Sequence, residues 1–153
     1  MDPCQLIHSC FIDSLSGLGQ ACRYGTSLSR RESELLILLI GVATQSTTEF
    51  DIHTGEAMRA GWSSEMIQAI PRDEDFSAAS VQNQLKDYYQ NPREAAIAQF
   101  AAELLETSTV SDETYYKTRK LVDGKDSVLM EIVAICGYYT LVSYTLNAFQ
   151  IQP

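Results

Sequence analysis

An apolar run from Glu34 to Val42 constrains the fold of this chain more than any other feature. Its hydrophobic side chains would lie on almost every face of a helix, and such a helix must be covered on all sides by other segments. Just before the run, Ser29 and Glu32 have the spacing of a capping box, in which each side chain bonds a free amide at the start of a helix. We therefore expect a helix that begins after Ser29 and lies at the centre of the fold.

Similar signals divide the rest of the chain into further helices. The expected starts are Thr47 or Thr48, Ser63, Asn91, Ser111 and Asp126 or Ser127, and the expected stops are Gly61, Pro71 and Gly124. Between them, the segment from Arg72 to Ser80 is polar and aperiodic, which is typical of a long loop. No stretch alternates apolar and polar residues for long enough to predict a sheet. The sequence thus predicts an all-α bundle of about seven helices, in one domain that spans residues 1–153.

The length and the cysteines fit a domain that folds without cross-links. A chain of 153 residues, 45% of them hydrophobic, can bury a core that needs neither disulfides nor a structural metal. The four cysteines are scattered and form no CxxC pair: Cys4, Cys10, Cys22 and Cys136. This pattern is typical of a reducing compartment, and the first residues lack the basic start and apolar core of a secretory signal. We expect a cytoplasmic protein.

The last segment, residues 132–153, carries no charge and is long enough to cross a membrane. It contains three tyrosines and several other polar residues, with Glu131 before it and no basic flank. These features favour a buried helix of the bundle over a membrane span.

The charge balance excludes two classes of partner. Eleven Lys and Arg stand against twenty Asp and Glu, which gives a formal net charge of −9. Such a field repels the phosphates of nucleic acids and anionic lipids, so we expect neither a nucleic acid nor a membrane surface as a partner. The chain has two histidines, His8 and His53, and His-based proton transfer depends on them. For His8 we expect a structural or solvent-exposed role.

Glu49 and His53 are the strongest local candidates for chemistry. On one expected helix they lie about 40° apart around the axis, so the carboxylate can orient the imidazole. A glutamate beside a histidine raises the pKa of the imidazole, which suits a general acid or base near neutral pH. The same spacing also fits an ordinary helix ion pair. A metal site would need a third ligand that no neighbouring residue supplies, and there is no glycine-rich phosphate loop, so we expect no metal and no cofactor.

Glu34 is the second unusual residue, since it stands at the start of the most apolar helix. If that helix is central, its carboxylate is partly desolvated and needs a partner, which His53 could provide. Alternatively, Glu34 simply caps the first turn, where a negative charge favours the helix dipole. Gly41 on the same face costs helix stability and predicts the close approach of another helix or of a ligand.

Together these residues resemble the carboxymuconolactone decarboxylase family and its alkylhydroperoxidase (AhpD-like) relatives. The likeness rests on Glu34, the apolar run with Gly41, the pair Glu49 and His53, the turn Ala60-Gly61 and the segment Ile67 to Ile70. It continues through residues 94–105 and 131–139, and so covers the chain from about Leu6 to Ala148.

In the peroxidase relatives a glutamate stands nineteen residues before the histidine, and the cysteines of a CxxC pair stand seven and four residues before it. Here Glu34 keeps the first spacing, but Ser46 and Glu49 occupy the cysteine positions. A serine and a carboxylate cannot cycle through a disulfide, so we do not expect peroxidase activity. The decarboxylase branch, which resembles this chain in having a glutamate in place of the second cysteine, fits better.

The resemblance implies a cofactor-free acid/base lyase, a decarboxylase that acts on a small oxygenated carboxylic acid or lactone. Loss of CO₂ or migration of a double bond would leave an enolate-like carbanion that must be stabilised and protonated. We expect His53 to move the proton, with Glu49 as its orienting partner or a second acid. Glu34 would be the buried carboxylate of this relay.

The resemblance also implies a homo-oligomer, a homotrimer or a hexamer, with pockets near subunit contacts. Ser46, Phe50 and Tyr138 are the residues that we expect to contact the substrate. Two alternatives stay open. The same relay could run an isomerisation, cyclisation or dehydration in a biosynthetic pathway, or the chain could be a non-catalytic helical binding subunit in which Glu49 and His53 form an ion pair.

An anionic substrate would meet an unfavourable overall field in so acidic a chain. A local basic residue would have to offset it, and the sequence offers Arg30, Arg31 and Arg72. Substrate specificity is expected from the segment 72–80 and from the tyrosine-rich last helix.

Overall fold

A computed structural model describes residues 9–152, and the expectations for Cys4 and His8 lie outside this range. The described part consists of eight α-helices and one 3-10 turn, without a strand. In chain order these are α1 (Ser9–Tyr24), α2 (Arg30–Ala43), α3 (Thr47–Arg59), α4 (Ser64–Ala69), η2 (Asp73–Asp75), α5 (Ala78–Leu85), α6 (Pro92–Thr107), α7 (Asp112–Leu121) and α8 (Asp126–Ala148). The expected all-α class is confirmed, with one helix more than the seven expected.

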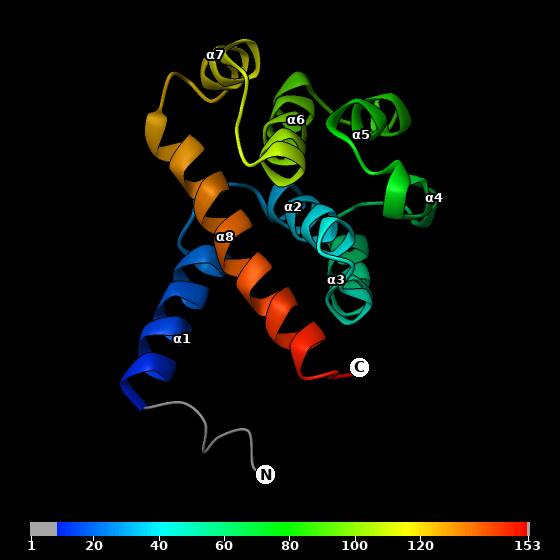
Figure 1. The fold of residues 1–153 in the computed structure, drawn as a ribbon. Helices are drawn as coiled ribbons and strands as arrows, with labels where there is room; N and C mark the ends of the chain where they lie inside the picture. Colours follow the sequence, from blue (N-terminus) through cyan, green and yellow to red (C-terminus); the bar gives the residue numbers. More distant parts are fainter. Residues whose placement is uncertain (1–8, 153) are drawn as a thin grey trace.

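α2 is the central helix, as the apolar run predicts. It packs against α3, α6 and α8, and Figure 1 shows it between α8 and α3. All of its residues from 34 to 42 are buried. The capping box is formed as well: the Ser29 hydroxyl accepts from the Glu32 amide at 3.1 Å, and the Glu32 carboxylate accepts from the Ser29 amide at 2.8 Å.

The buried side chains form two clusters on different sides of α2. Leu36 and Ile40 belong to a cluster that α6 and α8 complete. Leu35 and Leu39 belong to a second cluster with side chains from α3, α4, α5 and α6. Because both clusters share α2, the position of this helix determines where α3 and α8 meet.

The crossing of α2 and α3 explains Gly41. A Cβ atom on Gly41 would lie 3.2 Å from both Cβ and the backbone N of Phe50 on α3. That is closer than ordinary van der Waals contact, so glycine is what lets the two helices approach this far. Of the two neighbours that the sequence leaves open, the structure places a helix against Gly41.

The segment from Arg72 to Ser80, expected as a long loop, is only partly irregular. It contains the 3-10 turn η2, and α5 begins at Ala78. The Ser77 hydroxyl accepts from the Ser80 amide at 3.1 Å, and the Ser80 hydroxyl accepts from the Ser77 amide at 2.9 Å. The loop expectation is therefore wrong for residues 78–80, because a serine here takes the part that Glu or Gln usually takes in a capping box.

Among the described helices, α8 alone is long and apolar enough to cross a membrane by length and composition. In the structure it packs as a helix of the bundle, against α1, α2, α3, α6 and α7 (Figure 1). Its buried residues recur every three or four positions: Val128, Leu129, Ile132, Ile135, Cys136, Tyr139 and Ser143. Met130 and Tyr144 lie on the exposed side. One face of α8 thus belongs to the core.

Candidate active site

Glu34, Glu49 and His53 meet in the interior of the fold. Nδ1 of His53 lies 2.7 Å from Oε2 of Glu34, and Nε2 lies 3.3 Å from Oε1 of Glu49. The three side chains are each at most 5% exposed. The imidazole is therefore held between two carboxyl groups, one beside each ring nitrogen, and is shielded from bulk water.

Three helices build this arrangement. Glu34 comes from the start of α2, whereas Glu49 and His53 lie one turn apart on α3. Tyr139 of α8 packs against the imidazole in a T-shaped contact, with ring centroids 5.5 Å apart and planes at 86°. Such a contact restrains the ring. The orientation of His53 is thus fixed by segments that are far apart in the sequence.

The two contacts of His53 differ in kind. A carboxylate only accepts hydrogen bonds, so the 2.7 Å contact with Glu34 favours the tautomer with the ring proton on Nδ1. Nε2 is then the free nitrogen, on the side of Glu49. Burial raises the pKa of Glu49, while the charges of His53 and Arg23 lower it to a smaller extent. Because Oε1 of Glu49 has no hydrogen-bond partner among the described residues, this carboxyl group takes up a proton more readily than an ordinary glutamate.

A cavity of about 510 Å³ opens beside this group. His53 and Glu49 line it from α3, and Tyr138, Tyr139 and Val142 line it from α8. The other wall is one face of α1: Ser16, Gly19, Gln20, Arg23 and Tyr24. Burial raises the pKa of Tyr138 and raises that of Tyr139 to about 12, so both hydroxyls keep their protons at neutral pH and can donate. The cavity therefore offers a ligand an imidazole, a carboxyl group and two phenols.

The comparison with known families concerns these same residues. The sequence profile of the carboxymuconolactone decarboxylase family matches residues 11–86, about half of the chain. The chain belongs to this family. The match contains Glu34, Glu49 and His53, whereas α8 with its tyrosines lies outside it. No curated protein and no solved structure matches the chain.

The described cysteines lie away from the relay. At the two positions where the peroxidase relatives carry cysteines, this chain has Ser46 and Glu49. Cys22 and Cys136 are buried free cysteines, and neither lines the cavity of His53. Burial raises the pKa of both thiols, that of Cys136 to about 12. Protonated thiols are poor nucleophiles, so these two supply no redox centre to the site.

The three residues expected to contact a substrate do not lie together. Tyr138 lines the cavity of His53. Ser46 and Phe50 instead line a separate cavity of about 50 Å³, because Ser46 precedes α3 and lies nearly two turns from His53. Glu34 borders a third cavity, of about 360 Å³. The structure thus brings the three relay residues together with Tyr138, and places Ser46 and Phe50 elsewhere.

The basic residue that lines the cavity of His53 is not one of the three that we expected from the sequence. Of the three expected, Arg30 pairs with Glu56 and lines the neighbouring cavity that Glu34 borders, Arg31 pairs with Glu94, and Arg72 stacks on Phe50. The cavity of His53 is lined by Arg23 of α1. The signal that could have found it is the spacing of Gly19, Gln20 and Arg23, which puts them on one face of a helix. No group of three or more His, Cys, Asp or Glu side chains within the described part is placed to hold a metal ion.

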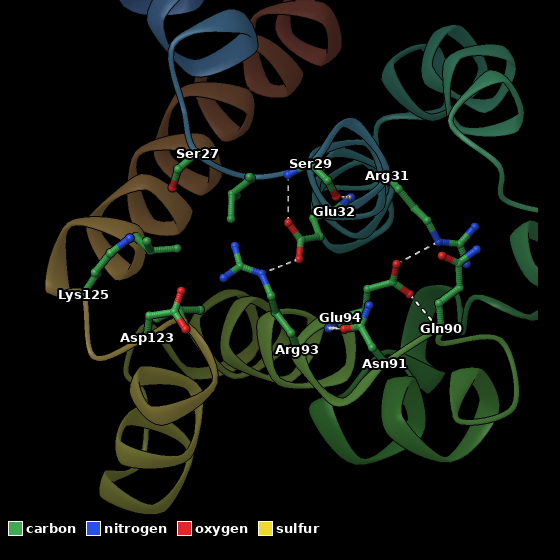
Figure 2. A pocket seen from close by; sticks show the side chains of 13 residues that line it. Ser27, Ser29, Arg31, Glu32, Gln90, Asn91, Arg93, Glu94, Asp123 and Lys125 are labelled. Carbon is green, nitrogen blue, oxygen red and sulfur yellow. Dashed lines mark hydrogen bonds and ion pairs between the residues drawn. The ribbon is translucent and has the colours of Figure 1, made fainter.

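A second spacious cavity, of about 580 Å³, lies at the starts of α2 and α6 and at the turn before α8; we refer to it as the polar cavity (Figure 2). Its buried carboxylates are paired, Glu94 with Arg31 at 2.9 Å and Glu32 with Arg93 at 2.7 Å. Figure 2 shows the two pairs side by side, each joining α2 to α6. No histidine or cysteine lines this cavity. Because its buried charges are paired, we interpret this cavity as part of the structural contact between α2 and α6.

Proposed function

We propose that this member of the carboxymuconolactone decarboxylase family is a cofactor-free acid/base lyase that decarboxylates a small oxygenated carboxylic acid or lactone. The observation that carries the proposal is the buried imidazole of His53, held between Glu34 and Glu49 at the wall of a cavity. Burial and fixed orientation of a titratable group beside a cavity are typical of catalytic acids and bases. They support an enzyme over a binding subunit with a surface ion pair.

Each residue has a distinct part in the proposed reaction. Loss of CO₂ leaves an enolate-like carbanion, and protonated His53 delivers a proton to it from Nε2. Glu34 holds Nδ1 and stabilises the imidazolium form between turnovers. Glu49, whose pKa burial raises, is the second acid or the orienting partner. The hydroxyl of Tyr138 donates to the enolate oxygen while charge develops there.

Replacing His53 tests the proposal. A His53→Gln variant should keep the fold, by circular dichroism and thermal melting, and should lose turnover. The assay incubates the protein with a panel of lactones and β-keto acids and follows both CO₂ release and product mass. Full activity of the variant would overturn the assignment of His53. A product of unchanged mass without CO₂ would indicate isomerisation or cyclisation on the same relay, and loss of one water would indicate dehydration.

We further propose that the protein works as a homotrimer or a hexamer. Large apolar side chains stay exposed on α1 and α8, among them Phe11 and Leu18 of α1 and Tyr144 of α8. α1 is also a wall of the cavity of His53, so subunit contacts through α1 would enclose the site. Size-exclusion chromatography with light scattering tests this expectation, and a clean monomer at micromolar concentration would contradict it.

A further inference from the structure

Arg23 differs from most arginines of this acidic chain, because no carboxylate in the described part forms an ion pair with it. Five of the seven arginines form ion pairs among the described residues: Arg30, Arg31, Arg59, Arg93 and Arg119. Arg72 stacks on Phe50. Arg23 contacts the ring of Tyr24, with Cζ 5.8 Å from the ring centroid, and no hydrogen-bond acceptor in the described part holds its guanidinium. Its N–H donors are therefore free to bind a ligand.

The unpaired guanidinium of Arg23 lies close to the relay residues. Its side chain lines the cavity of His53 and also the neighbouring cavity that Glu34 borders, so it lies beside the relay on both sides. Among the described residues that line the cavity of His53, it is the only lysine or arginine. The positive charge of Arg23 lowers the pKa of Glu49 and of Tyr139, against the effect of burial, which raises both.

We propose that Arg23 binds a carboxylate of the substrate and thereby selects small organic anions for the cavity of His53. The inference rests on the proposed function for the place of the reacting atoms. A guanidinium presents parallel N–H donors that match the two oxygens of a carboxylate, and charge assistance strengthens these bonds. The net charge of −9 repels such an anion at long range, and one unpaired guanidinium at the cavity restores attraction where it is needed.

The chemistry of decarboxylation decides which carboxylate Arg23 can hold. A carboxylate that leaves as CO₂ loses its charge, so an ion pair with it would be stronger before the reaction than in the transition state. Binding of that kind opposes catalysis. Arg23 therefore binds a carboxylate that stays on the product, while the reacting end of the molecule lies across the cavity at Nε2 of His53. Product-like carboxylates should bind for the same reason.

Binding of small carboxylates and of their neutral esters tests the proposal. The probes are levulinate with its methyl ester, and glutarate and 2-oxoglutarate with their dimethyl esters, titrated by ligand-observed NMR against the wild type and three variants. In Arg23→Gln the Kd of the carboxylates should rise about tenfold, while the Kd of the esters stays unchanged. Arg23→Lys should fall between, because an ammonium keeps the charge but not the parallel donors. Arg59→Gln, which removes the same charge from a side chain that is 69% exposed, should bind like the wild type.

The outcomes separate this inference from the proposed function. Carboxylate binding that depends on Arg23, without CO₂ release from any substrate, would leave the anion site standing and remove the decarboxylase assignment. Turnover that depends on His53, with Kd and KM unchanged in Arg23→Gln, would overturn the role of Arg23. Wild-type protein that binds none of the carboxylates more tightly than its ester would overturn it too.

Discussion

Glu32 and Glu34 stand two residues apart on α2 and are equally buried, yet their partners differ. Glu32 accepts from Nε of Arg93 at 2.7 Å and from the amide of Ser29 at 2.8 Å (Figure 2). Glu34 pairs with His53. A guanidinium keeps its proton at any pH that a folded protein meets, whereas an imidazole can both take up and release a proton. One carboxylate has a partner of permanent charge, and the other has a partner whose charge can change.

The same difference separates the polar cavity from the cavity of His53. Both oxygens of Glu94 in the polar cavity accept a hydrogen bond, from Arg31 at 2.9 Å and from the Gln90 amide at 2.8 Å. Oε1 of Glu49 beside His53 has no such partner within the described residues. A fully bonded set of charges stabilises one arrangement, while an incompletely bonded titratable group leaves capacity for a ligand or a proton. Burial of a carboxylate alone therefore does not mark a reaction site.

Removing the permanent charge from the polar cavity should have the largest effect. Arg31→Met leaves Glu94 buried without its cation, and it also removes hydrogen bonds to the carbonyls of Gly61 and Tyr88 and the contact with the ring of Trp62. Breaking a buried pair by removing one partner costs about 3–5 kcal/mol. Urea denaturation should show a loss of this size in the free energy of unfolding.

Arg119→Met is the matched control for this prediction. The pair of Arg119 with Asp126 lies at the surface, where solvent screens it and ion pairs contribute little. This variant should unfold at nearly the same urea concentration as the wild type. Equal losses of unfolding free energy in the two variants would show that burial does not determine how much an ion pair contributes to stability. The polar cavity would then have no special structural role.

The sequence was sufficient for the parts of the fold that local patterns determine. The capping box at Ser29 and Glu32 and the apolar run placed α2 correctly at the centre, and the spacing of Glu49 and His53 predicted their contact. The wall formed by α1 was missed, because the partner of an amphipathic helix depends on tertiary packing that no local pattern records. Arg23 could not be placed at the site without knowing that α1 packs against α8.

Breaking the ion pair of Glu34 with His53 should lower catalysis and leave stability nearly unchanged. Glu34→Gln keeps a hydrogen-bond acceptor for Nδ1 of His53 but loses the charge that stabilises the imidazolium form. We expect kcat to fall about 10²-fold, with the melting temperature close to that of the wild type. Glu32→Gln, on the same helix, should keep kcat and lower stability slightly. A variant of Glu34 with normal kcat would show that both glutamates are structural.

The crossing of α2 and α3 should affect both stability and catalysis, because it brings Glu34 to His53. Gly41→Ala places a methyl group against the backbone of Phe50 and should cost about 1–3 kcal/mol of unfolding free energy through overpacking. The control is Gly55→Ala on α3, where an added Cβ meets nothing within 4 Å and should raise stability by up to about 1 kcal/mol. Calorimetric melting compares the two. A neutral Gly41→Ala would mean that the helices can separate slightly without cost.

The smallest expected effect is a change in how stability depends on pH. Burial raises the pKa of Glu49 above its value in the unfolded chain, so the folded state holds this proton more tightly. Where the folded state binds more protons than the unfolded state, stability falls as the pH rises, here from about the ordinary glutamate pKa of ~4.3 upward. Glu49→Gln removes that loss of stability. The urea midpoint of the variant should therefore rise relative to that of the wild type between pH 4 and pH 7. Glu65→Gln is a control for which we expect the opposite trend. Hydrogen bonds from its own backbone amide and from Ser63 lower the pKa of Glu65. The urea midpoint of this variant should therefore fall relative to that of the wild type as the pH rises. A Glu49→Gln variant whose stability instead falls relative to the wild type as the pH rises would mean that Glu49 stays charged in the folded state. The contrast between the two cavities would then rest on Glu34 and His53 alone.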